Sequence, residues 1–446
     1  KKMKEEEEEE EDDDDEIPLP HVSYDDVRDI IAEVTGHRET PDEMRLKYAG
    51  HAEFLHDAPR NRAYRRAIEE AAKGSKLTID IGTGSGILGL MAARAGAERV
   101  IAFEVVEELA TLAEANVVAA GYEGRITVLN VESTMAVPKN HAAAAGDWSV
   151  TMDVEGMRVM DYTAPRADLV VSELLDTQLI GEGLLPTLRH AAATLLAPGY
   201  RCVPAGATVW AQVVQCDHFA AMGTLKPFMC ADAAAAIDNN PARGVRPGIA
   251  TCPGQPSHMD MHLGPMLANG TITPLTAPFP ALQLDFTNLP PPGQHAAVFD
   301  VPVLRAGDAA QLAWKGGKKG KHKGKGHHHP PVAADAVAHA VIFWWDCDLG
   351  PGGEGEGRVV LSTSPEHNGG RDHWRQGVRP LPVPLRIPAR QEEEEEGSAP
   401  TLLRVVVTHD DDNISFKVGC GEHWARQPPP PPRQQGQQQQ QQQPLQ

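Results

Sequence analysis

The hydrophobic positions between residues 77 and 214 follow two alternating periodicities. Short apolar runs of strand length occur at 77–81, 99–103, 125–130, 167–172 and 206–214. Between them, apolar residues recur at helical spacing over 86–95, 107–120 and 184–196. A further helical stretch, roughly 60–73, precedes the first run and ends at Gly74. Strands that alternate with amphipathic helices predict a parallel, doubly wound sheet.

From about Asp217 the helical periodicity fades, and proline and glycine become more frequent. Short alternating segments there predict the strands of a β-rich second domain, at 283–286, 297–304, 337–346, 358–363 and 402–407. The stretch 133–165 is predicted to be irregular. The chain of 446 residues, with 41% apolar content, is long enough to build two such domains and their tails.

Low-complexity segments lie at both ends and within the second domain. They are an acidic run at 5–16, a Lys/Gly run at 315–325 followed by histidines at 327–329, an acidic run at 392–396, a proline run at 428–432 and a glutamine tail. Such segments are expected to be solvated and disordered. The three histidines have no cysteine or acidic partner nearby, so a solvated insertion is favoured and no metal is expected.

The formal charge of −21 argues against direct nucleic-acid binding, because phosphate affinity depends on clusters of Lys and Arg. Cationic partners fit this surface better. The six cysteines form no C-x-x-C pair, which indicates a reducing compartment, and a cytoplasmic or nuclear location is expected. No membrane association is expected, because no apolar run approaches the ~20 residues that span a bilayer.

A glycine-rich turn joins the first strand to the next helix in the segment 76–89, KLTIDIGTGSGILG. Gly82, Gly84 and Gly86 have the spacing G-x-G-x-G, and Asp80 stands two residues before the first glycine. A dinucleotide-binding loop has G-x-G-x-x-G, in which the third glycine allows the helix to pack closely on the strand. The spacing therefore favours S-adenosyl-L-methionine over NAD as the cofactor.

Three acidic residues follow neighbouring strands of the predicted sheet, where ligands of doubly wound sheets bind. Asp80 and the glycine loop follow the first strand, and the bare loop backbone can approach the methionine part of the cofactor. Glu104 ends the second strand and can accept hydrogen bonds from both ribose hydroxyls; Glu132 follows the third and can accept one from an adenine amino group. Each acid alone is more simply a helix cap or a solvated group, but together they favour a cofactor site.

Two glutamates follow the fourth strand in the segment 170–185, VVSELLDTQLIGEGLL. Glu173 and Glu182 are nine residues apart and flank an apolar loop with glycines. One interpretation is a capping and turn motif. The other is a carboxylate clamp for a planar cation, because two carboxylates can engage a guanidinium from two sides with bidentate geometry.

The sequence E-L-L-D-T-Q-L-I-G-E-G around these glutamates resembles the double-glutamate loop of the protein arginine N-methyltransferases. His51 and Arg60 resemble the family's segment ahead of the glycine loop, which implies that both contact the cofactor, the arginine at its carboxylate. Asp372, His373 and Trp374 are similar to the substrate-side loop of one branch of the family, which has Asp-His-Trp where most members have Thr-His-Trp. The resemblance extends over most of the chain.

The resemblance implies methyl transfer from S-adenosyl-L-methionine to arginine guanidinium nitrogens in proteins. It makes Glu173 and Glu182 the clamp and His373 a helper for orientation or proton removal. Asp372 and Trp374 become substrate-side residues. The branch with Asp-His-Trp further implies monomethylation, and Arg-rich substrates such as histones or RNA-binding proteins are expected.

The expected fold is α/β, a class I methyltransferase-like, doubly wound Rossmann-type sheet followed by a β-barrel-like substrate domain. The domain prediction is an acidic tail at 1–20, a methyltransferase domain at 21–214, a β-rich barrel domain at 215–425 and a Pro/Gln-rich tail at 426–446. The related branch usually has two tandem modules, whereas one glycine loop is present here. Either a homodimer or a truncated gene product is therefore expected.

Two other functions are weighed against methyl transfer. A catalytically silent scaffold would bind Arg-rich segments through an acidic groove, but the joint presence of Arg60, Asp80, Glu104, Glu173 and Glu182 speaks against it. A NAD oxidoreductase is disfavoured because the loop lacks the G-x-G-x-x-G spacing.

Overall fold

The computed structural model describes residues 55–139, 146–152, 160–223, 258–304, 336–353, 355, 357–366, 374–387 and 401–421. The predicted tails and low-complexity insertions lie outside these residues. Within the described part of the chain, no helix combines the length and the apolarity needed to cross a bilayer.

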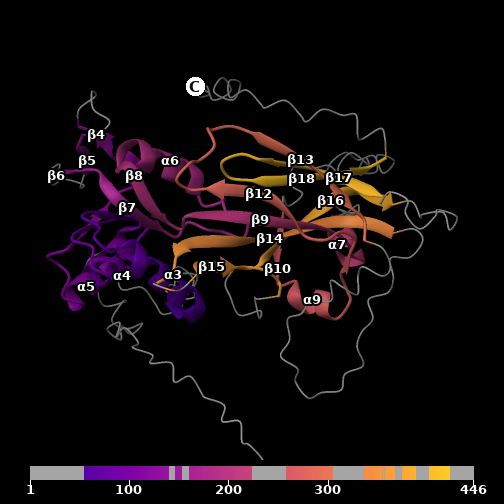
Figure 1. Ribbon diagram of the computed structural model, residues 1–446, viewed down its shortest axis with the longest axis horizontal. Coiled ribbons are helices and arrows are strands. Elements are labelled where there is room, and N and C mark those ends of the chain that lie inside the picture. The colour runs from indigo at the N-terminus through magenta and orange to yellow at the C-terminus, as the bar shows by residue number, and fades with distance from the viewer. Residues whose placement is uncertain are drawn as a thin grey trace, which may run out of the picture.

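Five parallel strands form the first sheet, in the order β3–β2–β1–β7–β8. They are β1 (Thr78–Ile81), β2 (Val100–Glu104), β3 (Ile126–Asn130), β7 (Ala167–Ser172) and β8 (Leu196–Val203). The helices are α3 (Ala58–Ala71), α4 (Ile87–Arg94), α5 (Glu107–Ala119) and α6 (Leu184–Thr194) (Figure 1). All residues of β1 and β2 are buried, as in strands covered on both faces. The predicted doubly wound parallel sheet is confirmed.

Two details of the predicted sheet are wrong. β8 begins at Leu196, where the sequence pattern predicted the end of a helix, and its proline and glycine concealed it as a strand. The segment 206–214, predicted as part of the alternating pattern, forms β9 (Gly206–Gln215), which pairs antiparallel with strands of the second domain. The change from parallel to antiparallel pairing therefore falls before β9 rather than after it.

The stretch 133–165, predicted to be irregular, contains a 3-10 helix (Ser133–Met135) and a small antiparallel sheet of β4 (Val137–Pro138), β5 (Trp148–Met152) and β6 (Met160–Ala164). Trp148 anchors this sheet. Its side chain is fully buried, its ring centroid lies 5.7 Å from that of Phe103, and its Nε1 donates to the carbonyl of Pro165 at 3.0 Å. The buried indole of Trp148 thus stabilises strands that are too short for their sequence to show the alternation typical of a strand.

Antiparallel strands form the second domain. A seven-stranded sheet contains β9, β10 (Met259–Met261), β11 (Thr273–Pro274), β12 (Phe279–Asp285), β14 (Ala336–Pro351), β15 (Arg358–Ser362) and β16 (Gln376–Ile387). A three-stranded sheet contains β13 (His295–Pro302), β17 (Leu402–His409) and β18 (Ile414–Cys420). Helices α7 (Asp217–Gly223) and α9 (Gly264–Ala268) are short. The ring of Phe343 on β14 packs against Phe416 on β18, so the two sheets enclose a shared core.

The sequence predicted five strands of this domain but missed β10, β11, β16 and β18. β16 carries prolines at 380, 382 and 384, which remove ladder donors and argue against a strand. In the structure Pro380 lies opposite Ala340, and the register of β16 on β14 shifts between Ala338 and Ala340. This irregularity accommodates the prolines that concealed the strand.

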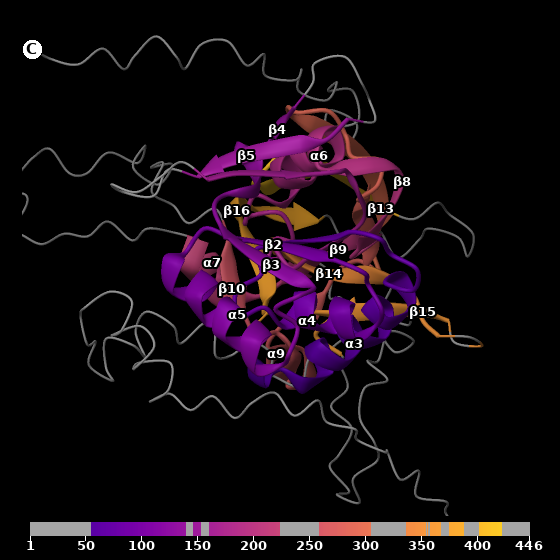
Figure 2. The ribbon, with the colours of Figure 1, turned by 90° about the vertical axis from the view of Figure 1, so that its left-hand side faces the viewer.

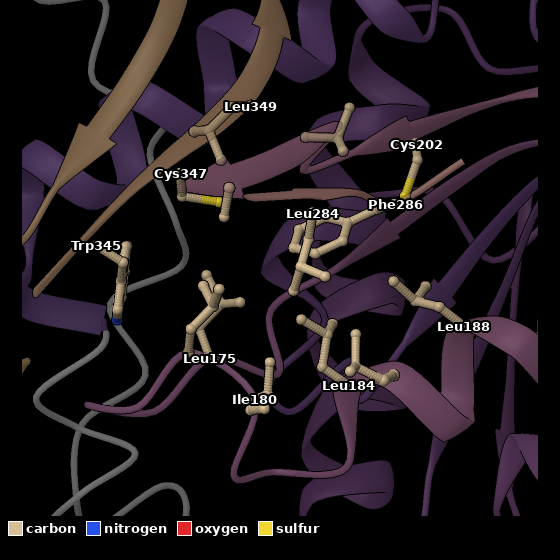
Figure 3. Close-up of a cluster of buried hydrophobic side chains, with 14 of the residues drawn as sticks. Leu175, Ile180, Leu184, Leu188, Cys202, Leu284, Phe286, Trp345, Cys347 and Leu349 are labelled. Carbon is tan, nitrogen blue, oxygen red and sulfur yellow. The ribbon is translucent and has the colours of Figure 1, made fainter. Parts of the chain in front are cut away.

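The two domains share a continuous hydrophobic core. Figure 2 shows the ribbon from the side of the first domain, with α3, α4 and α5 toward the viewer. Figure 3 shows its centre, where side chains of α6, β8, β12 and β14 meet those of the loop after β7. At the rim, Arg189 of α6 donates to both carboxylate oxygens of Asp411, at 3.0 and 2.6 Å. The loop between β7 and α6 is therefore enclosed between the domains.

Substitution of Gly377 tests the packing of β16 on β14. A Cβ there would lie 2.1 Å from Cζ of Phe343, within a closely packed core. We expect Gly377→Ala to lower the free energy of unfolding by about 1–3 kcal/mol through overpacking. Gly124→Ala is the matched control, because a Cβ at Gly124 meets no atom within 4 Å. Urea unfolding of both variants measures the difference, and equal losses of stability would contradict the packing described here.

Candidate active site

The glycine loop between β1 and α4 turns through left-handed residues. Gly82, Gly84 and Gly86 have φ values of 70°, 56° and 89°, which side chains disfavour. The amides of Gly82 and Thr83 both donate to the carbonyl of Phe103 on β2, at 3.0 Å. A Cβ at Gly82 would lie 2.9 Å from Cδ2 of Leu174. The loop therefore passes close to the segment after β7, with little room for a larger side chain.

Asp80 lies behind the glycine loop and is fully buried. Its Oδ2 accepts hydrogen bonds from Thr83 Oγ1 at 2.5 Å and from the amide of Gly89 at 2.8 Å, so this carboxylate shapes the turn. Burial raises the pKa of Asp80 to about 7, although both hydrogen bonds act in the opposite direction. Its Oδ1 is buried and has no hydrogen-bond partner in the described part of the chain.

Glu104 ends β2 and is buried beside the glycine loop. One carboxylate oxygen accepts from the amide of Gly84 at 2.8 Å, and the other accepts from the amide of Val106 at 2.9 Å. Each oxygen keeps further acceptor capacity for hydroxyl groups of a ligand. Asn116 of α5 donates to the carbonyl of Ser85 at 2.9 Å, which fixes the far side of the loop.

Glu132 lies two residues beyond the end of β3, on the same sheet edge as Glu104. Its side chain is exposed, and its carboxylate accepts a hydrogen bond from the hydroxyl of Thr134. The structure thus places Glu132 where the sequence pattern predicted it, at the end of the strand next to β2. Its contact with an adenine amino group stays a prediction.

Arg60 joins α3 to the segment after β7. Asp57 caps α3 and accepts from the amide of Arg60 at 2.9 Å, so the arginine stands in the first turn. Its Nη2 donates to Oε2 of Glu173 at 2.6 Å, and both side chains are largely buried. Charge-assisted bonds of this length are strong, and a buried carboxylate requires such a partner. The arginine predicted to bind the cofactor and one glutamate of the predicted clamp are therefore in direct contact.

The double-glutamate loop, residues 173–182, has a strained and internally bonded backbone. Leu179 has φ of 79°, which is unusual for a residue with a side chain, and it is fully buried. Its amide donates to the carbonyl of Asp176 at 2.9 Å, and Asp176 Oδ1 accepts from the amide of Gly181 at 3.0 Å. A Cβ at Gly181 would lie 2.2 Å from Oδ2 of Asp176, so a larger residue there would displace the Asp176 carboxylate from the turn.

Two indoles of the second domain bind consecutive carbonyls of this loop. Nε1 of Trp374 donates to the carbonyl of Leu175 at 2.8 Å, and Nε1 of Trp345 donates to that of Asp176 at 2.9 Å. The two rings meet edge to face with centroids 5.0 Å apart. Trp345 is fully buried and Trp374 is 4% exposed. The loop is therefore held by the β-rich domain, and Trp374 packs behind it; a direct contact of Trp374 with substrate stays a prediction.

Glu182 stands at the end of the loop and is exposed to solvent by surface area. Partial desolvation, followed by the negative charges of Glu173 and Asp176, raises the pKa of Glu182 to about 7. Glu173, Asp176 and Glu182 thus form one cluster of negative charge on the loop. Such a cluster attracts a cation, which would relieve the repulsion.

Three predicted site residues, His51, Asp372 and His373, lie outside the described residues, so their roles stay predictions. Sequence reasoning missed the role of Trp345, although the repeated tryptophan in the strand-like FWWD segment was a signal. It also missed Asp260 of β10, whose hydrogen bonds to His258 and Thr177 hold its pKa below the usual range. These bonds bring β10 to the double-glutamate loop.

These residues fit an S-adenosylmethionine-type ligand. Left-handed glycines form a cradle that side chains would fill, Glu104 has spare acceptor capacity, and the buried Oδ1 of Asp80 lacks a partner in the described part of the chain. Arg60 can bind a carboxylate group, because its guanidinium already binds that of Glu173. A G-x-G-x-G loop at the carboxyl edge of this sheet defines a class I methyltransferase-like fold.

Comparisons with known proteins specify the family. The family model of ribosomal protein L11 methyltransferase (PrmA) matches residues 65–145. Protein arginine N-methyltransferase 7 of Danio rerio is 30% identical over 384 residues, which cover 82% of this chain and 45% of that protein. The protein of the same name from Anopheles gambiae is 30% identical over 409 residues, covering 84% of this chain and 49% of that protein. The chain belongs to the protein arginine N-methyltransferase family, as its double-glutamate loop indicated.

The chain spans about half the length of the curated relatives that it matches. Solved structures confirm the fold. A Trypanosoma brucei PRMT1 enzyme–prozyme heterotetrameric complex with AdoHcy has a TM-score of 0.54 and 19% identity, over 85% of this chain and 96% of that chain. Protein arginine methyltransferase 10 of Arabidopsis thaliana has a TM-score of 0.50 and 17% identity, over 83% of this chain and 95% of that chain.

Substitution of Trp345 by Phe tests how the loop is held. The phenyl ring keeps much of the packing but cannot donate to the carbonyl of Asp176. Loss of one hydrogen bond is expected to speed hydrogen exchange of the amides in residues 173–182 by about fivefold. Trp210→Phe is the matched control, because Nε1 of Trp210 makes a bond of equal length, 2.9 Å, to Asp346 on β14. Unchanged exchange in the loop of the Trp345 variant would show that the indole does not hold it.

Proposed function

We propose that this chain transfers the methyl group of S-adenosyl-L-methionine to guanidinium nitrogens of arginine residues in proteins. The observation that carries the proposal is the double-glutamate loop, which bears Glu173 and Glu182 and passes close to the glycine loop at Leu174. Glu173 already binds one guanidinium, that of Arg60, and partial burial together with the charge of Glu173 raises the pKa of Glu182. A planar cation with several N–H donors is the ligand that such a pair of carboxylates binds.

S-Adenosylmethionine would supply an electrophilic methyl group on a sulfonium. The nitrogen–methyl bond forms as the sulfur–methyl bond breaks, and the substrate nitrogen releases a proton. Arginine stays protonated with a pKa above ~12, so the lone pair of the attacking nitrogen is delocalised. Glu173 and Glu182 would hold the positive charge on the nitrogens that they face, which leaves the target nitrogen more nucleophilic.

The protein's own contacts would provide the positioning that this chemistry requires. Arg60 fixes the orientation of Glu173, and the indoles of Trp345 and Trp374 fix the loop backbone between the two glutamates. Burial of this junction excludes water from the ion pair. Positioning and electrostatics, rather than a strong base, would therefore account for most of the rate. His373 remains the proposed helper for orientation or proton removal.

The finer assignments are proposals supported by likeness to the curated relatives. We propose monomethylation, because the loop resembles that of the Asp-His-Trp branch. Arg-rich proteins such as histones or RNA-binding proteins are the proposed substrates, and the formal charge of −21 favours cationic partners. We also propose that the chain forms a homodimer and that it is located in the cytoplasm or the nucleus. A catalytically silent scaffold is not favoured, because the cofactor cradle and the clamp occur together at one edge of the sheet.

Charge-neutral substitution of the clamp tests the reaction. Glu173→Gln and Glu182→Gln are each expected to lower methylation of an Arg/Gly-rich peptide by at least about a hundredfold. Binding of S-adenosylhomocysteine by Glu182→Gln should persist, because Glu104 and the glycine loop are unchanged. Mass spectrometry with labelled cofactor measures transfer and counts methyl groups, and calorimetry measures binding.

Glu123→Gln is the control for this experiment, because Glu123 is exposed in the turn before β3. Its activity should equal that of the unmodified chain. Wild-type-like transfer by either clamp variant would contradict the clamp. Cofactor binding without any methyl transfer by the unmodified chain would favour the scaffold.

The raised pKa of Glu182 predicts a pH dependence. The carboxylate must be ionised to hold a guanidinium, so kcat/KM is expected to rise with pH through about 7. Asp176→Asn removes one negative charge that raises the pKa of Glu182, so the rise should move to lower pH. Asp80 also has a pKa of about 7, but Asp176 is not among the groups that shift it. If kcat/KM of the Asp176→Asn variant rises at the same pH as that of the unmodified chain, the rise belongs to a group other than Glu182.

A further inference from the structure

Tyr64 is a buried phenol that contacts both halves of the site. It lies on α3, and its side chain is fully buried. Its hydroxyl donates to the carbonyl of Ser172 at 3.3 Å. Ser172 is the last residue of β7, and Glu173 follows it directly. The phenol is therefore bonded to the backbone from which the double-glutamate loop begins.

The ring of Tyr64 carries the second contact. The guanidinium carbon of Arg60 lies 5.3 Å from the ring centroid, within the range of a cation–π interaction. The same guanidinium donates to Glu173 at 2.6 Å. Tyr64, Arg60 and Glu173 thus form a closed arrangement, in which the ring supports the arginine and the hydroxyl supports the strand end that carries the glutamate.

The surroundings of Tyr64 keep its hydroxyl a donor. Burial and the nearby charge of Glu173 raise the pKa of the phenol well above its ordinary value. The other ionisable groups facing it are Arg60, Cys202 and Cys347. The phenol is consequently protonated over any working pH range, and its bond to Ser172 does not depend on pH.

We propose that Tyr64 is a positioning residue for methyl transfer, which sets the clamp through Ser172 and the cofactor-side arginine through its ring. This inference rests on the function proposed above. It differs from a general packing role in one respect: the two contacts are separable. The hydroxyl acts on the clamp, and hence on the rate of the chemical step, whereas the ring acts on Arg60, and hence on cofactor affinity as well as on the Glu173 that Arg60 binds.

Two substitutions separate these contacts. Tyr64→Phe keeps the ring and removes the hydroxyl, so kcat for peptide methylation should fall about fivefold while the cofactor Kd changes by less than about twofold. Tyr64→Leu removes both contacts, so a fall in kcat at least as large should be joined by a rise in cofactor Kd of about fivefold. Calorimetry with S-adenosylhomocysteine gives Kd, and labelled-methyl transfer at saturating cofactor gives kcat.

Tyr200→Phe is the matched control. The hydroxyl of Tyr200 donates to the carbonyl of Phe286 at 3.3 Å, a bond of equal length outside the site. Its kcat and Kd should equal those of the unmodified chain, and thermal unfolding of all variants reports folding. A Tyr64→Phe variant with the kcat of the Tyr200 control would overturn the inference. So would a fall in kcat accompanied by an equal rise in Kd.

The unmodified chain separates this inference from the proposed function. If it methylates no arginine peptide, the proposed function fails, whatever the Tyr64 variants do. If it is active and the Tyr64→Phe variant is equally active, the proposed function stands and the positioning role fails. A selective loss of kcat in Tyr64→Phe, with the Kd effect confined to Tyr64→Leu, supports the positioning role.

Discussion

The loop between β7 and α6 must be rigid, although its sequence forms neither helix nor strand. Two indole N–H groups from the β-rich domain bind its carbonyls at Leu175 and Asp176, and the left-handed residue Leu179 closes its turn. Neither domain alone supplies this arrangement. The parallel sheet delivers the loop to its carboxyl edge, and the second domain fixes the backbone there. The relative position of the domains, held by a common core and the Arg189–Asp411 pair, therefore determines where the two glutamates stand.

The electrostatics of the site follow from this geometry. Glu173 is buried and has a cationic partner in Arg60, whereas Glu182 has two neighbouring carboxylates, and no cation of the described residues lowers its pKa. The cluster therefore carries uncompensated negative charge at the end facing solvent. A guanidinium entering there would supply the missing positive charge, while Arg60 is paired with Glu173. The same pair of acids thus binds one inner cation, Arg60, and would bind an outer one, the guanidinium of the proposed substrate.

Local pattern was sufficient for four of the five parallel strands, β1, β2, β3 and β7, because they are short apolar runs next to strong turn and helix signals. It was also sufficient for the glycine loop and the two glutamates, which are contiguous motifs. It was not sufficient for β8. Local pattern failed where long-range contacts determine the structure. β16 forms despite three prolines because its register on β14 is irregular. β5 is stabilised by one buried tryptophan, Trp148. The contacts of Arg60 with Glu173 and of Trp345 with Asp176 join residues 113 and 169 positions apart, and no periodicity reports such pairs.

A crystal structure of the chain with S-adenosylhomocysteine and an arginine-containing peptide would test the central claim most directly. The account predicts that carboxylate oxygens of both Glu173 and Glu182 lie within hydrogen-bonding distance of the peptide guanidinium, with Arg60 at the cofactor carboxylate and both indoles still bonded to the loop. A guanidinium bound away from the loop, or held by only one of the two glutamates, would contradict it.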